Sequence, residues 1–161
     1  SMFLHELGHI TAAVYMGKKI YSFRILPVGF NAVVQDTGLS ALKNTIIYIS
    51  GPTVNIVFSI VGFTINSYYL HQSNDMLFFV SANVCLAVFN MLPVIPLDGG
   101  MIFREVLSGY IGFFSAERYV KRVRKGISVL LILLGVFQLV SSTWNVSFIL
   151  IGVYIFFICL A

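Results

Sequence analysis

Long apolar runs without charge, separated by short polar segments, dominate the pattern of this chain. The runs that contain no Asp, Glu, Lys or Arg span residues 44–74, 76–97 and 126–161. Each run exceeds the ~20 residues that a helix needs to cross a bilayer. A shorter apolar segment at residues 2–16 carries Glu6 as its only charged residue. We expect about five transmembrane helices: one in this segment, one in each of the first two runs, and a hairpin of two in the last, divided by polar residues 141–145.

The segment at residues 20–36 has a different pattern. It is rich in β-branched and aromatic residues, with Pro27 and Gly29 near its middle. This composition predicts two short strands around a bend, in a re-entrant or membrane-surface segment. The expected fold class is therefore an all-α membrane protein, a polytopic transmembrane helix bundle with a short β-like segment at 20–36.

The second long run ends with two prolines, and two glycines follow shortly after it. Pro93 and Pro96 are expected to end a helix, so residues 97–100 (Leu-Asp-Gly-Gly) should be irregular backbone. Residues 101–119 mix charged and apolar side chains and predict a short amphipathic or peripheral helix. We expect one membrane-embedded domain over residues 1–161, shortened at both ends, because the last apolar run continues to the final residue.

Composition supports a membrane protein and excludes an ordinary soluble domain. Hydrophobic residues make up 58% of the chain and charged residues only 10%, and the mean hydropathy is +0.94. Soluble domains carry about 25% charged residues. A soluble fold of this length would have too few charges to cover its surface.

The positive charges are confined to two segments. The net charge is +4, and all ten Lys and Arg residues lie within residues 17–43 and 98–125. Both segments fall on one side of the membrane if the chain crosses as expected, and the positive-inside rule makes that side cytoplasmic. Because the basic residues 118–125 directly precede an apolar run, we expect the lipid bilayer, and no nucleic acid, as their partner.

The sequence His5-Glu6-Leu7-Gly8-His9 is the first candidate for chemistry. On a helix, residues i and i+4 share one face, so His5 and His9 can direct two imidazole nitrogens at one zinc ion. Glu6 can then take a proton from a metal-activated water molecule. A pattern this short also occurs by chance, and a buried histidine bonded to a carbonyl is commoner than a metal ligand. The interpretation therefore depends on the rest of the chain.

Asp98 is the best candidate for a third ligand. It directly follows an apolar helix, and the two glycines after it allow close approach of the backbone. Each other acidic residue lies on the opposite side of the membrane or among polar or basic neighbours: Asp75, Asp36, Glu105 and Glu117. An aqueous pocket that opens to the cytoplasm would suit His5, His9 and Asp98.

Three motifs together resemble the site-2 protease family of intramembrane zinc metalloproteases. They are HELGH at residues 5–9, Gly-Pro-Thr-Val-Asn at residues 51–55, and Asn-Met-Leu-Pro-Val-Ile-Pro-Leu-Asp-Gly-Gly at residues 90–100. The compact layout is similar to the sporulation-factor branch, which activates a membrane-associated pro-sigma factor. The resemblance implies zinc on His5, His9 and Asp98, with Glu6 as general base and acid in peptide-bond hydrolysis. That branch usually carries a further amino-terminal helix and a cytosolic nucleotide-binding domain.

Several expectations stay open at this point. Asn90 and Asn55 are candidates for substrate binding or for donating to the oxyanion, and the alternative for each is an interhelical hydrogen bond. The segment at 20–36 could accept an unwound substrate as an added strand, or could only plug the bundle. Expected partners are a membrane-associated protein substrate, the bilayer, and a membrane-protein inhibitor or regulator, while the oligomeric state is left open. The competing functions are a zinc transporter and a catalytically inactive membrane-binding relative.

Overall fold

Eight elements follow the hydrophobic pattern of the chain. The computed structural model describes all residues except 19, 27–28, 35–39, 70–72, 142–146 and 159–161. Its elements are α1 (Met2–Tyr15), β1 (Ile20–Leu26), β2 (Gly29–Val34), α2 (Ala41–Tyr68), α3 (Asn74–Asn90), α4 (Asp98–Ile111), α5 (Phe113–Val140) and α6 (Ser147–Ile158). They form two compact units, Ser1–Leu92 and Pro93–Ala161. The single domain expected over residues 1–161 stays a prediction.

Helix α1 ends in a turn at Gly17. Gly17 adopts a positive φ of 84°, a conformation that glycine enters without the steric cost of a Cβ atom. The Gly17 amide donates to the Val14 carbonyl and the Lys18 amide to the Ala13 carbonyl, each at 2.9 Å. These bonds satisfy carbonyls that have no partner within the helix.

The segment after α1 forms a two-stranded antiparallel sheet. Strands β1 and β2 pair with Phe23 opposite Ala32 and Ile25 opposite Phe30, and the register is irregular between Ile20 and Ser22. The expected bend falls on residues 27–28, outside the described residues. The chain is therefore helical with one β-hairpin in the described part, and the position of that hairpin at a membrane stays a prediction.

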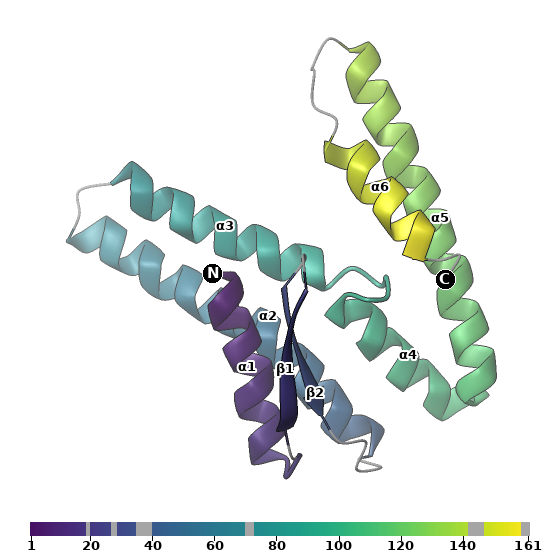
Figure 1. Cartoon of the computed structure of the whole chain (residues 1–161). Helices are drawn as coiled ribbons and strands as arrows, with labels where there is room; N and C mark the ends of the chain where they lie inside the picture. The colour runs from purple at the N-terminus through teal and green to yellow at the C-terminus, as the bar shows by residue number, and fades with distance from the viewer. Residues whose placement is uncertain (19, 27–28, 35–39, 70–72, 142–146, 159–161) are drawn as a thin grey trace. The chain divides into compact units, whose positions relative to one another are not determined.

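A stripe of small and polar residues packs α2 against its neighbours. The buried residues on this stripe are Gly51, Asn55, Ser59, Gly62 and Asn66. A Cβ atom at Gly62 would lie 3.1 Å from a methyl group of Val80 in α3, and α2 and α3 lie side by side in the first unit (Figure 1). Small residues allow two helices to approach closely where apolar burial gives little driving force.

The second unit differs from the sequence prediction in two places. Asp98 is the first residue of α4, so irregular backbone at residues 98–100 was a wrong expectation. An acidic side chain in the first turn stabilises a helix by interacting with its amino-terminal dipole. Gly112, with φ of 79°, separates α4 from α5, so the predicted helix over 101–119 is divided there. The basic residues 118–125 consequently lie inside α5 and not in a loop.

Six helices are described, where about five spans plus one peripheral helix were expected. Among the described residues, α2 and α5 are long and apolar enough to cross a membrane, and α3 and α6 are shorter apolar helices. Within the second unit α6 packs along α5 (Figure 1), where the Ser128 hydroxyl donates to the Gly152 carbonyl at 3.0 Å. Residues 142–146, the expected division of this hairpin, lie outside the described residues.

Candidate metal centre

The two histidines of α1 direct the same ring nitrogen at one point. His5 Nε2 and His9 Nε2 lie 3.1 Å apart, and the rings are nearly perpendicular, with centroids 4.7 Å apart. Two nitrogens that bind one tetrahedral zinc ion at about 2.0–2.1 Å would be about 3.3 Å apart. The spacing of the pair therefore fits a shared zinc ion, as the i, i+4 pattern predicts.

Glycines in α1 and α2 make room for the two rings. A Cβ atom at Gly51 would lie 2.6 Å from His9 Cε1 and 2.9 Å from His5 Cε1, closer than real Cβ contacts. A Cβ atom at Gly8 would lie 2.9 Å from the Ser50 carbonyl oxygen on α2. The helices can therefore approach closely enough to seat both imidazoles only because these positions lack side chains.

The protonation of His9 is determined by its hydrogen bond. His9 Nδ1 lies 2.8 Å from the Ile47 carbonyl oxygen. A carbonyl can only accept, so Nδ1 carries the proton and Nε2 presents a lone pair in the neutral ring. The backbone of α2 thus orients one ligand, which sequence reasoning missed because it involves no side chain.

His5 has a side-chain partner on the same helix. His5 Nδ1 lies 3.0 Å from Asn55 Nδ2; His5 is 4% exposed and Asn55 is fully buried. With the amide in this orientation Nδ2 donates to Nδ1, and Asn55 Oδ1 has no hydrogen-bond partner among the described residues. Rotation of the amide by 180° exchanges the two atoms. Oδ1 would then accept from Nδ1–H, and His5 Nε2 would also present a lone pair.

The other predicted site residues lie in different surroundings. Glu6 follows His5 on α1 and is half-buried. Asn90 is the last residue of α3, and its Nδ2 donates to the Leu86 carbonyl at 3.0 Å. Asp98 begins α4, in the other unit, and is half-buried. The structure of the first unit thus brings together His5, His9 and Asn55.

The backbone around Asp98 is closely packed. Gly99 and Gly100 are buried, and a Cβ atom at Gly100 would overlap the backbone of Val94 and Ile95. The Leu97 amide donates to the Val94 carbonyl at 2.7 Å. These contacts fix the turn that leads into α4 and therefore the position at which Asp98 starts the helix.

Comparison with known proteins finds similarity to peptidases. The sequence model of peptidase family M50 matches residues 69–134. The solved site-2 protease from Methanocaldococcus jannaschii is similar, with a TM-score of 0.75 and 27% identity, over 98% of this chain and 71% of that chain. This chain is thus similar in sequence and structure to site-2 proteases, and residues 69–134 are similar to peptidase family M50.

Two curated relatives are similar to this chain over much of its length. A zinc metalloprotease of Methanocaldococcus jannaschii is 29% identical over 160 residues, which is 98% of this chain and 45% of the relative. Stage IV sporulation protein FB of Bacillus subtilis is 28% identical over 116 residues, 71% of this chain and 40% of the relative. The chain thus spans less than half the length of these relatives.

Proposed function

We propose that this chain carries the catalytic centre of an intramembrane zinc metalloprotease that cleaves a membrane-associated regulatory protein. The observation that carries the proposal is the pair of imidazoles on α1, whose Nε2 atoms lie 3.1 Å apart. Each ring also has a hydrogen-bond partner at Nδ1: the Ile47 carbonyl for His9 and the Asn55 side chain for His5. Such outer partners orient metal-binding histidines and increase their basicity.

The proposed metal ligands are His5, His9 and Asp98, a two-histidine and one-carboxylate set that leaves a fourth position for water and substrate. Bound zinc supplies a Lewis acid that polarises the scissile carbonyl and makes water more acidic. Glu6 accepts the proton of the attacking water and later gives it to the leaving amine nitrogen. Glu6 suits this role because it follows His5 directly on α1.

Stabilisation of the oxyanion is proposed for Asn90. Its amide nitrogen carries two N–H groups, and the bond to the Leu86 carbonyl uses only one of them. The second can donate to the negative oxygen that develops during attack on the peptide bond. Asn55 was the other candidate. Because its buried side chain contacts His5, we assign it to orienting that ligand.

The β-hairpin is proposed as the place where substrate unwinds. Helical carbonyls are already hydrogen-bonded, so a scissile bond must leave its helix before cleavage. A two-stranded sheet has outer edges to which an extended segment can add. Proline substitution at Ala32 or Val33 in β2 should impair cleavage while zinc stays bound. Unchanged cleavage would refute strand addition at this hairpin.

The proposal also includes the orientation of the chain in the membrane, its substrate and its regulator. The chain crosses the membrane several times, with segments 17–43 and 98–125 on the cytoplasmic side and the active site open to the cytoplasm. The ten-to-zero distribution of Lys and Arg supports this orientation. Similarity to Stage IV sporulation protein FB supports a pro-sigma factor as one class of substrate. A membrane-protein inhibitor is a further proposed partner.

The proposal is tested by cleavage of doubly tagged, membrane-associated proteins, pro-sigma factors among them, by wild-type protein and Glu6→Gln in the same membranes. We expect Glu6→Gln to keep its zinc and lose cleavage, because the amide cannot accept the proton. A zinc transporter would still move zinc after this substitution. An inactive relative would give no cleavage with either protein, and both of these outcomes would refute the proposed activity.

A further inference from the structure

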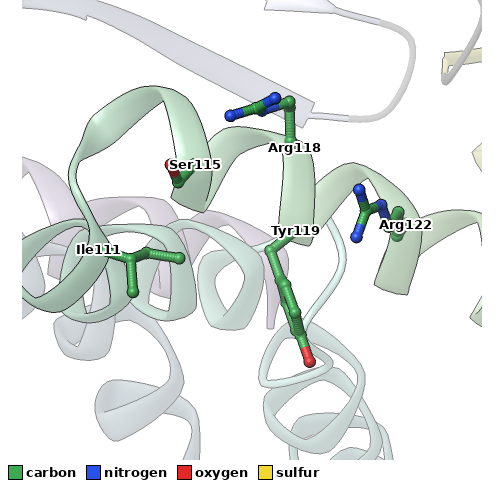
Figure 2. A pocket seen from close by; sticks show the side chains of 5 residues that line it. All are labelled: Ile111, Ser115, Arg118, Tyr119 and Arg122. Atoms are coloured by element: carbon green, nitrogen blue, oxygen red, sulfur yellow. The ribbon is translucent and has the colours of Figure 1, made fainter.

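A cationic groove lies where α4 meets the first turns of α5. It has a volume of about 230 Å³ and is lined by Ile111, Ser115, Arg118, Tyr119 and Arg122. Figure 2 shows Arg118 and Arg122 projecting from successive turns of α5, with Tyr119 between them in sequence. None of these residues belongs to the proposed zinc site.

The two arginines of the groove differ from neighbouring cations in their partners. Arg104 pairs with Glu105 at 3.7 Å and with Glu117 at 3.8 Å, and Lys121 pairs with Glu117 at 3.7 Å. Arg118 and Arg122 are exposed, and neither has an ion-pair partner in the described part of the chain. Their charges can therefore bind an external anion.

The spacing of the arginines suits a phosphate group. Residues i and i+4 of a helix have Cβ atoms about 5–6 Å apart, so two guanidinium groups can approach one phosphate from adjacent turns. Guanidinium groups bind phosphate oxygens through paired N–H donors. Ser115 lies one turn before Arg118 and lines the same groove, which adds a hydroxyl donor.

The helix face that carries these residues becomes apolar further along α5. At helical spacing it continues through Gly126 to Val129, Leu133, Phe137 and Val140, whose exposures are 43%, 61%, 70% and 80%. From Arg122 to Val140 the helix rises about 27 Å, close to the ~30 Å hydrocarbon core of a bilayer. The groove thus lies at the height of lipid headgroups when the apolar face lies among acyl chains.

We propose that this groove binds the headgroup of one anionic phospholipid. The lipid phosphate lies between Arg118 and Arg122 and accepts from Ser115, while an acyl chain lies along Val129 and Leu133. A soluble anion would satisfy the arginines but leave the apolar face uncovered. An acidic protein segment would also leave the apolar face uncovered. A phospholipid matches both the arginines and the apolar face.

Lipid binding is measured by native mass spectrometry of the whole chain in neutral detergent, titrated with dioleoyl phosphatidylglycerol or dioleoyl phosphatidylcholine. These lipids share their acyl chains and differ in net charge. We expect wild type to bind one phosphatidylglycerol at least tenfold more tightly than phosphatidylcholine. The double variant Arg118→Gln/Arg122→Gln should bind phosphatidylglycerol about 30-fold more weakly, because each basic residue near an anionic lipid contributes roughly a factor of five.

Two controls separate a headgroup site from general attraction. Lys43→Gln/Lys121→Gln removes the same charge outside the groove and should change phosphatidylglycerol affinity less than threefold; equal weakening by both double variants would overturn the proposal. Dihexanoyl phosphatidylglycerol should bind at least tenfold more weakly than the dioleoyl lipid, because its chains cannot follow the apolar face. Equal binding of the two lipids, or displacement by inorganic phosphate, would show a site for soluble anions instead.

Discussion

The hydrogen bond between Asn55 and His5 gives a quantitative test of how the zinc ligands are oriented. Asn55→Leu replaces a fully buried amide by a side chain of nearly the same size that can neither donate nor accept. His5 Nδ1 then loses the partner that lies 3.0 Å away. Loss of an outer partner of a metal-binding histidine weakens metal binding by about 10- to 100-fold, or roughly 1.4–2.7 kcal/mol.

The assay is competition for zinc between the purified protein in detergent and a fluorescent chelator of known affinity. Asn66→Leu is the matched control, because Asn66 is 2% exposed on the same stripe of α2 and lies three helical turns beyond Asn55. We expect Asn66→Leu to change zinc affinity less than threefold. Asn55→Asp should keep affinity near that of wild type, since a carboxylate accepts the proton of His5 Nδ1.

Thermal unfolding in the presence of EDTA separates ligand orientation from general stability. Both leucine variants should shift the unfolding midpoint of zinc-free protein by similar amounts, whereas only Asn55→Leu should lose stabilisation by added zinc. Unchanged zinc affinity in Asn55→Leu, or an equal loss in both variants, would refute the assigned role of Asn55.

Three further substitutions test the packing around and beyond the site. Gly51→Ala should reduce zinc affinity at least tenfold, because its Cβ atom would lie 2.6 Å from His9 Cε1, whereas Gly109→Ala, which meets no atom within 4 Å, should leave it unchanged. Gly100→Ala should lower stability by about 1–3 kcal/mol through overlap with the preceding turn, measured as the thermal midpoint; an unshifted midpoint would contradict that packing. Ser128→Ala should cost about 0.6–1 kcal/mol by removing the buried bond to the Gly152 carbonyl, measured by unfolding in mixed micelles, and a stability equal to wild type would show that this bond contributes nothing.

Much of the helical structure could be predicted from the sequence, because uncharged apolar runs and glycine or proline signals have few alternatives. Helices α2 and α3 in the first two uncharged runs and the strands on either side of residues 27–28 are examples. The boundary between α4 and α5 was missed. A lone glycine such as Gly112 does not by itself predict a break. The charges at residues 118–125 do not mark a helix start either, because exposed basic residues are well tolerated in a helix.

The histidine pair could also be predicted, since helical periodicity alone places residues 5 and 9 on one face. The hydrogen-bond partners of the two Nδ1 atoms could not be predicted. Asn55 is 50 residues from His5 in sequence, and the Ile47 carbonyl has no side-chain signature. Both depend on how closely α1 approaches α2, which is determined by Gly8 and Gly51.

The measurement that most directly tests the proposed zinc site is the zinc content of purified wild type, Asp98→Ala and Glu105→Gln, the last being an acidic residue of the same helix outside the proposed site. We expect about one zinc ion per chain in wild type and in Glu105→Gln, and almost none in Asp98→Ala, because two imidazoles alone hold zinc weakly. Full zinc content with wild-type affinity in Asp98→Ala would contradict a centre that joins the α1 histidines to the first residue of α4.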